Sequence, residues 1–250
     1  MWKFVIGLSA LVVALPLAAA RADDPAQAKA VLDKAIQAAG GEQTLARFEA
    51  VTVKGKGTLH EKKDTAFTTE VSVEGADRAR IVNDSKEDGK PTREVDVIDG
   101  DKGWTKKDNE AAEELDDATL KDLKEWLYVN WVTTLVPLRG EGFQLTPLGD
   151  SRAGGRAVVG LRVAHKGHKD VELFFDKETG LLAKSRAQVK DVESGKEVTE
   201  STLYEQYKEF QGTKQPTKIT TLWDGKPREE LELTEVRLAE KLPDKVFAKP

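Results

Sequence analysis

The strongest constraint on the fold is a repeated alternation of apolar and polar residues. Across residues 51–59, valine, glycine and leucine occupy every second position, with threonine or lysine between them. Successive side chains of a β-strand point to opposite faces of a sheet, so this pattern predicts a strand with one buried face. Residues 171–189 repeat it in two arms around a turn at 176–180, where Gly180 can adopt a positive φ. Such segments recur along the chain and predict an antiparallel sheet of successive hairpins.

Two details of these strands need the structure for their interpretation. Gly55 and Gly57 lie on the apolar face of the strand at 51–59, where they either bend the sheet or leave room for a close neighbour. In residues 228–238 the alternation changes phase between Leu233 and Val236, which predicts a β-bulge.

Two segments break the strand pattern and predict helices. The first begins with Asp24 as N-cap and ends at Gly40-Gly41. The second is expected over residues 116–138, where Pro137 contributes to its end. Its C-terminal half is apolar nearly all round, which predicts contacts on more than one side.

Together, about ten to eleven strands and two substantial helices predict an α+β fold with helices covering one face of a long antiparallel sheet. A β-sandwich would explain the alternation equally well but would leave the broad apolar helix without a partner surface. No linker or low-complexity tract interrupts residues 23–250, which are therefore predicted to form a single domain.

The first 22 residues predict a cleaved secretory signal. Lys3 precedes an apolar core, and Ala20-Arg21-Ala22 forms a cleavage site with small residues at its ends. We expect the mature protein in the periplasm or secreted, with no transmembrane helix and, because the chain lacks cysteine, no lipid anchor. Removal of Lys3 and Arg21 changes the formal net charge from −5 to −7, which argues against a nucleic-acid partner.

Few groups in the sequence are arranged for chemistry. His165 and His168 have the spacing of a possible metal-ligand pair, but they lie on a predicted turn without a third ligand nearby. No recognised catalytic or phosphate-binding motif occurs, and the lack of cysteine excludes a cysteine nucleophile. We therefore predict a non-enzymatic protein with no metal and no cofactor; a hydrolase with a dispersed site is the remaining catalytic alternative.

Aromatic residues are the feature that favours a binding role. They are spread over the predicted strands and the second helix, where ordinary core packing is an equally good interpretation. Phe174 and Phe175 lie on opposite faces of one strand. The face that carries Phe174 is therefore either covered by another element or in contact with a partner.

Several short motifs resemble the periplasmic lipoprotein carriers of the LolA/LolB type, and especially their uncharacterised outer membrane lipoprotein-sorting relatives. These motifs are Ala38-Ala39-Gly40-Gly41, residues 97–104 (VIDGDKGW), residues 143–147 (FQLTP), residues 173–182 (LFFDKETGLL) and the closing residues 242–247, where Phe247 is an expected core anchor. The resemblance spans most of the mature chain.

The resemblance implies a half-open β-barrel whose concave face is covered by helices over an apolar cavity that shields acyl chains. The candidate residues of the cavity and its lid are Trp104, Leu123, Trp126, Leu127, Trp131, Phe143, Leu173 and Phe175. The implied partner is a lipid or the acyl chain of a lipoprotein, with envelope proteins as further partners and the protein itself a monomer. A cell-envelope structural or interaction protein with the same fold and a filled core is the alternative.

Overall fold

The computed structural model describes residues 24–191 and 195–250, so the predicted signal peptide lies outside it. A first run of consecutive antiparallel strands comprises β1 (Ala50–Leu59), β2 (Thr65–Glu74), β3 (Arg78–Glu87), β4 (Lys90–Asp99), β5 (Lys102–Lys107) and β6 (Glu113–Glu114). A second run comprises β7 (Phe143–Ala153), β8 (Arg156–His165), β9 (Val171–Asp176), β10 (Leu182–Lys190) and β11 (Glu197–Glu205). The remaining strands are β12 (Lys208–Phe210), β13 (Thr213–Gln215), β14 (Lys218–Trp223) and β15 (Lys226–Ala239).

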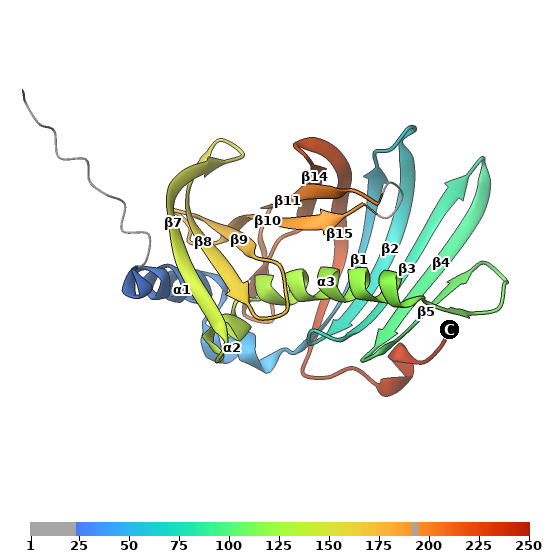
Figure 1. Ribbon diagram of the computed structural model, residues 1–250, viewed down its shortest axis with the longest axis horizontal. Coiled ribbons are helices and arrows are strands. Elements are labelled where there is room, and N and C mark those ends of the chain that lie inside the picture. The colour runs from blue at the N-terminus through green and yellow to red at the C-terminus, as the bar shows by residue number, and fades with distance from the viewer. Residues whose placement is uncertain (1–23, 192–194) are drawn as a thin grey trace, which may run out of the picture.

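Strand β15 joins the two runs into one sheet. It pairs with β1 on one side and with β14 on the other, and β14 pairs with β11. Over the described residues, the sheet has thirteen strands in the order β6-β5-β4-β3-β2-β1-β15-β14-β11-β10-β9-β8-β7, with β6 and β7 at its two edges. Figure 1 shows this sheet curving around the helices without closing on itself. The predicted α+β fold, with a long curved antiparallel sheet open like half a barrel, is confirmed.

The number of strands exceeds the expected ten to eleven. Strands β5, β6 and β13 lie in segments that are too charged or too short to show alternation. The predicted strand at 196–210 is divided into β11 and β12 because Gln206 has a φ of 54°, outside the β region. Strands β12 and β13 form a separate two-stranded sheet.

Both predicted helices are present, but the second is shorter than expected. Helix α1 (Pro25–Ala39) begins where the Asp24 carboxylate accepts two backbone hydrogen bonds and ends at Gly40, and a short α2 (Glu42–Arg47) follows. Helix α3 (Asp117–Thr133) stops before Leu135, whose φ is 71°, and a 3-10 turn η1 (Val136–Arg139) follows. Pro137 explains the difference, because it has no N–H to donate to the carbonyl of Thr133 and its ring would crowd that carbonyl in a continuing helix.

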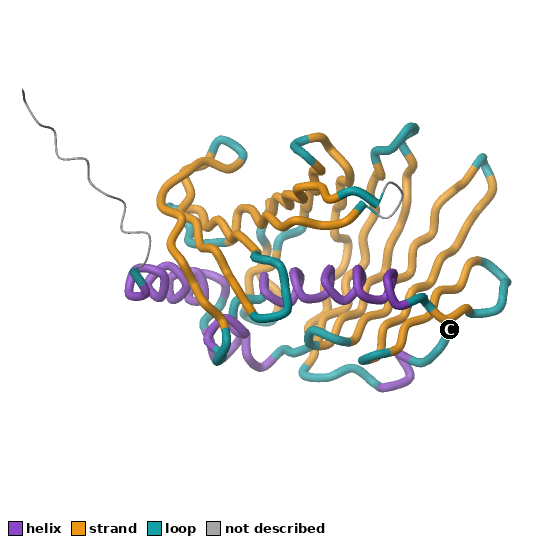
Figure 2. Tube along the Cα trace, viewed as in Figure 1, coloured by secondary structure: helices purple, strands orange, loops and turns teal. Residues whose placement is uncertain are grey.

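Helices α1 and α3 both lie on the concave face of the sheet (Figure 2). The main core lies between them and the second run of strands. Its buried side chains include Leu32 and Ile36 of α1, Tyr128 and Val132 of α3, and Leu161, Leu173 and Phe175 of the sheet. The expected packing of the helices on the concave face is confirmed.

The outer face of β3 and β4 is covered by the C-terminal segment. A 3-10 turn, η2 (Asp244–Phe247), places the ring of Phe247 against three valines of these strands, and the ring has no exposed surface. The guanidinium of Arg78 lies 4.3 Å from the centre of that ring and forms ion pairs with Asp99 and Asp244 at 3.0 and 3.2 Å. The expected anchoring of Phe247 in the core is confirmed.

The hairpin of β9 and β10 forms the floor beneath α3, and the alternation of its second arm changes phase once. Leu182 shares the main core with Phe175, whereas Ala183 lies with Phe174 on the outer face. A register shift between Leu182 and Lys184 reverses the alternation at that point. Phe174 is covered there by side chains of neighbouring strands, including Leu148 of β7. Of the two interpretations of its face, coverage by another element is therefore the one that applies.

Candidate functional site

The N-terminal half of α3 (residues 117–126) lies over the first run of strands with much less burial than the rest of the helix. All fully buried residues of α3 fall at or after Leu127. Leu120, Leu123 and Trp126 are only half-buried, although they pack towards Ala79 and Ile98 of the sheet. Half-buried apolar side chains on a concave surface are the kind of surface that an apolar ligand can cover.

Close approach of this half of the helix depends on a glycine in β5. A Cβ atom added at Gly103 would lie 2.7 Å from Leu115 and 2.9 Å from Leu120, so no side chain fits there without displacing them. An ion pair of 2.6 Å between Lys124 and Asp101 adds a contact at the surface, where such pairs contribute little.

The eight residues predicted for the cavity and lid fall into three groups. Leu123, Trp126 and Leu127 belong to the contact of α3 with β3 and β4. Trp131, Phe143, Leu173 and Phe175 belong to the main core, where the rings of Trp131 and Phe143 lie 5.9 Å apart. Trp104 stands apart from the others.

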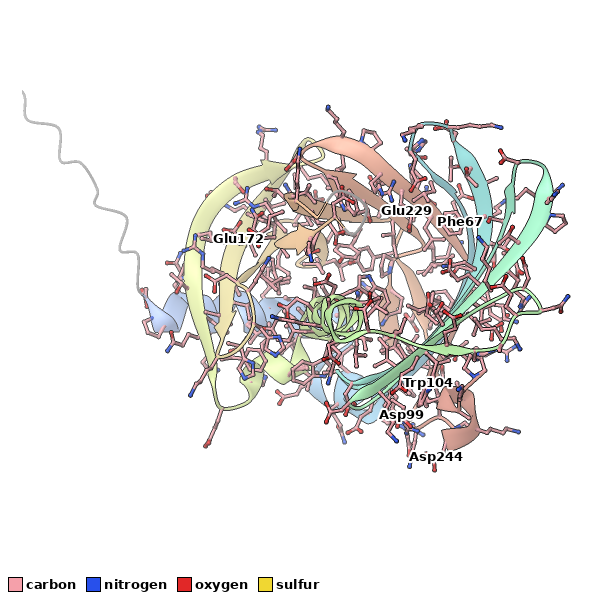
Figure 3. All side chains as sticks on the ribbon, turned by 45° about the vertical axis from the view of Figure 1, so that its right-hand side comes forward. Phe67, Asp99, Trp104, Glu172, Glu229 and Asp244 are labelled. Atoms are coloured by element: carbon pink, nitrogen blue, oxygen red, sulfur yellow. The ribbon has the colours of Figure 1, made fainter. Side chains whose placement is uncertain are left out.

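Trp104 lies on the face of the sheet opposite to α3. It pairs directly with Val97, which packs on Phe247, whereas the adjacent Ile98 packs on α3. Trp104 packs on the same cluster as Phe247 and Leu242 of the C-terminal segment (Figure 3 labels Trp104). The sequence could not reveal this, because the parity of a strand does not say which of its faces a helix will cover.

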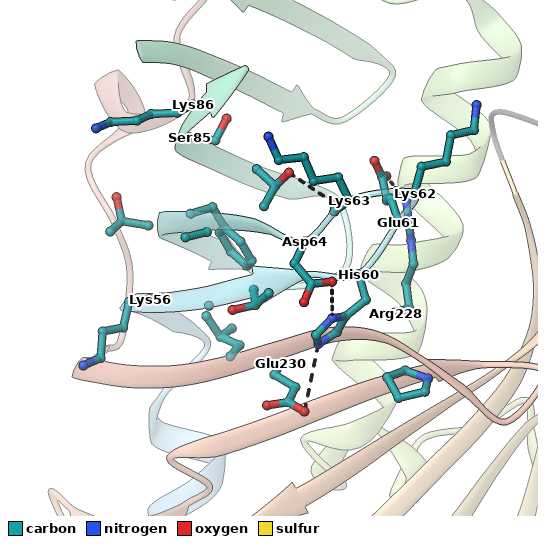
Figure 4. A pocket seen from close by; sticks show the side chains of 18 of the residues that line it. Lys56, His60, Glu61, Lys62, Lys63, Asp64, Ser85, Lys86, Arg228 and Glu230 are labelled. Atoms are coloured by element: carbon teal, nitrogen blue, oxygen red, sulfur yellow. Dashed lines mark hydrogen bonds and ion pairs between the residues drawn. The ribbon is translucent and has the colours of Figure 1, made fainter. Parts of the chain in front are cut away.

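A cavity of about 1690 Å³ opens at the end of the sheet where the β1–β2, β3–β4 and β14–β15 hairpins turn. Its apolar lining includes Phe67, Trp223 and Leu231 (Figure 4 shows its side chains). No residue of α3 lines it. The open space on the sheet therefore lies beyond the helix, whereas the floor directly beneath the C-terminal half of the helix is filled.

Gly55 and Gly57 of β1 leave room for two of these apolar side chains. A Cβ atom at Gly57 would lie 2.8 Å from the Phe67 ring, and one at Gly55 would lie 2.7 Å from the Leu231 side chain. The sheet is also irregular here, because the pairing of β1 with β15 shifts between Lys54 and Gly55. This shift is the β-bulge that the phase change in residues 228–238 predicts. Both interpretations of the glycines therefore apply.

Three carboxyl groups that the sequence did not single out lie on the concave face, and two of them, Glu200 and Glu229, adjoin residues that line the cavity. Burial raises the pKa of the Glu200 carboxyl, which accepts a 3.0 Å hydrogen bond from the indole N–H of Trp223. Burial also raises the pKa of the Glu229 carboxyl, and the nearby Glu200 carboxylate raises it further. Burial likewise raises the pKa of Asp96 on β4. Desolvation favours the neutral form of each group.

We expect Glu229→Gln to increase stability at neutral pH. A carboxyl whose folded pKa exceeds its unfolded pKa binds more protons when folded, so its charged form opposes folding above the folded pKa. The amide has no charge, and the free energy of unfolding at pH 7 should rise by up to about 1 kcal/mol. The difference from the wild type should shrink as the pH falls through the folded pKa.

Urea denaturation at several pH values measures this difference, and Glu230→Gln, at the exposed neighbouring residue, is the matched control. Equal stability of Glu229→Gln and the wild type at pH 7 would show that burial of Glu229 has no energetic cost.

His165 and His168 form part of an aromatic stack on the β8–β9 turn. The His168 ring lies 3.7 Å from the Tyr128 ring, and its Nδ1 lies 3.0 Å from a carboxylate oxygen of Glu125. The His165 ring stacks on Phe143 at 4.4 Å. Across residues 24–191 and 195–250, no three histidine, aspartate or glutamate side chains are placed to hold a metal ion. The pair therefore connects α3 to the sheet.

The sequence gives no sign that Phe67, Leu231 and the carboxyl groups are neighbours of Trp223. They come from β2, β4, β11, β14 and β15, which are brought together by the pairings of β1 with β15, β15 with β14 and β14 with β11. The signal available was the alternation of apolar and polar residues within each strand, and this alternation does not give the order of the strands in the sheet. Within the described residues, none of the helices has the length and apolar character needed to cross a membrane.

The sequence matches no protein-family profile and no curated protein. Solved structures nevertheless share the fold over almost the full length of both chains. A LolA superfamily protein from Nitrosomonas europaea aligns with a TM-score of 0.56 and 14% identity, covering 89% of this chain and 97% of that one. A domain named for outer membrane lipoprotein sorting, from Vibrio parahaemolyticus, aligns with a TM-score of 0.54 and 13% identity over 89% and 97%.

A DUF1329 family protein from Desulfovibrio piger aligns with a TM-score of 0.57 and 13% identity over 90% of this chain and 98% of that one. Identities this low show a shared fold and nothing finer. The chain has a LolA-like fold.

Proposed function

We propose that this chain is an exported, non-enzymatic protein of the periplasm or cell exterior, with residues 23–250 as one domain, that carries or senses a lipid or lipoprotein acyl chain. The name of the Vibrio structure, outer membrane lipoprotein sorting, supports this direction. The ligand would lie on the concave face, between the N-terminal half of α3 and the strands of the first run.

The observation that carries the proposal is the uneven burial of α3. From Leu127 onward the helix is held by fully buried side chains, but before it Leu123 and Trp126 remain partly exposed over an open concave sheet. Lifting this half of the helix would uncover Ala79 and Ile98, which it buries in the empty protein. An alkyl chain placed beneath the lifted helix would cover them again, and each methylene that it buries contributes about 0.8 kcal/mol. A ligand with higher affinity for the lifted state would shift the helix towards it.

In this proposal, Leu123 and Trp126 touch the ligand, Leu127 is the point about which the helix lifts, and Trp131 and Phe143 hold the other end. Leu173 and Phe175 form the adjacent floor. Trp104 supports β5 from the outer face instead of touching the ligand, which is consistent with its packing near Phe247.

A second function is favoured by a specific observation. Leu127, Leu173 and Phe175 are at most 1% exposed, so the space beneath the C-terminal half of α3 is full. A protein with the same fold and a filled core would act as a structural or interaction partner in the cell envelope, without a lipid.

We expect Trp126→Ala to reduce uptake of a fluorescent fatty acid about tenfold while reducing the free energy of unfolding only modestly, because the indole is half-buried. The matched control is Val132→Ala, at a fully buried position of the fixed half. It should reduce stability and leave uptake by the folded protein unchanged. Parallel losses of uptake and stability in both variants would favour the filled-core alternative.

A further inference from the structure

The hairpin tips around the large cavity carry an uneven set of charges. The described lining residues include as many basic as acidic side chains, so their formal charge is balanced. Their pairing is not balanced. Glu61 pairs with Arg228 at 2.7 Å, Glu232 with Lys56 at 3.9 Å, and Asp84 with Arg93, which lies outside the lining. Asp64 and Glu230 lie 2.9 and 4.0 Å from His60, and among the described residues Asp88 has no ion pair.

Four lysines of the lining have no ion-pair partner among the described residues. They are Lys62 and Lys63 at the β1–β2 turn, Lys86 at the end of β3, and Lys226 at the start of β15. All four are exposed. Figure 4 shows Lys62, Lys63 and Lys86 extending from two neighbouring hairpins. Three separate turns therefore place unpaired ammonium groups at the mouth of one cavity.

The same cavity has an apolar surface below these lysines. Phe67 and Leu231 lie over Gly57 and Gly55, and Trp223 stands on the adjacent β14. A molecule that fills this space meets apolar side chains along the sheet and positive charge at the tips. An alkyl chain can be buried against the apolar side chains, and an anionic group can interact with the ammonium groups at the tips.

We propose that the ligand of this protein is an anionic amphiphile, a single long-chain molecule with a carboxylate or phosphate head held by Lys62, Lys63, Lys86 and Lys226. The alkyl chain lies along Phe67, Trp223 and Leu231 towards the N-terminal half of α3. This inference rests on the proposed function and adds the charge class of the ligand and the place of its head.

Binding of a fluorescent fatty acid is compared with binding of its methyl ester, which keeps the chain and loses the charge. The mature protein should bind the acid roughly tenfold more tightly at low salt, because several weak surface pairs add up, and the advantage should shrink at high salt. Lys62→Gln, Lys63→Gln and Lys86→Gln together should remove the advantage and leave ester binding unchanged.

The matched control replaces Lys214, Lys245 and Lys249 by glutamine, since these are also exposed lysines without ion pairs in the described part of the chain and do not line the cavity. It should bind the acid as the wild type does. An equal loss in the control, or no loss in the tip variant, would overturn the assignment of the head.

Three further outcomes separate this inference from its alternatives. Displacement of the fatty acid by millimolar butyrate or inorganic phosphate would mean a site for free anions, and the amphiphile assignment would be wrong. Tight binding of acid and ester alike would overturn the anionic class but keep the proposed function. Binding of neither would overturn both.

Discussion

An engineered disulfide between α3 and β5 is expected to reduce lipid uptake by tenfold or more. In the variant Gly103→Cys with Leu120→Cys, the Cβ at position 103 would lie 2.9 Å from the present position of a Leu120 methyl carbon. The change Leu120→Cys removes that methyl carbon, and the Leu115 side chain, 2.7 Å from the added Cβ, has to shift to admit the cysteine at position 103. A disulfide then forms if the two Cβ atoms settle about 3.5–4.5 Å apart. The chain has no other cysteine, so only this pair can form. The bond would hold the N-terminal half of α3 on the sheet and remove the lifted state that the ligand needs.

Uptake of a fluorescent fatty acid is measured with the variant oxidised and again after reduction, which serves as its own control. Reduction should restore uptake to near the wild-type value. If the oxidised and reduced forms took up the probe equally, α3 would not move during binding, and the ligand would enter the cavity beyond the helix directly.

Phe247→Ala is expected to produce the largest loss of stability. The ring is fully buried against three valines of β3 and β4 and beneath the Arg78 guanidinium, so truncation leaves a cavity in the outer core. Replacement of a buried phenylalanine by alanine costs about 3–5 kcal/mol. For a chain of this size that corresponds to a decrease of roughly 10 °C in Tm.

Chemical denaturation of the variant measures this cost, and Lys245→Ala provides the control. Lys245 lies two residues away on the same turn and is exposed, so its substitution should change the free energy of unfolding by less than about 0.5 kcal/mol. A cost below about 1 kcal/mol for Phe247→Ala would show that the C-terminal segment contributes little to the sheet.

Much of the fold follows from local patterns in the sequence. The alternation in residues 51–59 and 171–189 defines strands whose one face must be buried, and Asp24, Gly40 and Gly180 mark ends and turns that the structure contains. Even the bulge at 233–236 is visible as a change of phase. These features depend on a few neighbouring residues, which is why one sequence suffices to find them.

The candidate site is harder to predict from the sequence than the fold, because it depends on contacts between segments that are distant in the chain. The charged segment around Trp104 does not indicate which way its side chain points, and the C-terminal segment covers the face on which it lies. Phe67 and Leu231 become neighbours only because β15 returns to pair with β1. Glu229 sits in a strand rich in charged residues, and its burial beside Glu200 has no signature in the sequence. The alternation of residues in a strand predicts which side chains share a face. Which other segments pack on that face depends on the order of the strands in the sheet.

The central claim is that the concave face holds an apolar ligand, and the contents of the purified protein test it most directly. The mature chain is purified from cells without detergent, extracted with organic solvent, and the extract is examined by mass spectrometry. We predict a long-chain amphiphile in the extract and renewed uptake of a fluorescent fatty acid by the extracted and refolded protein. An empty extract, together with no uptake of the probe, would contradict the account and leave a protein of the same fold with a filled core.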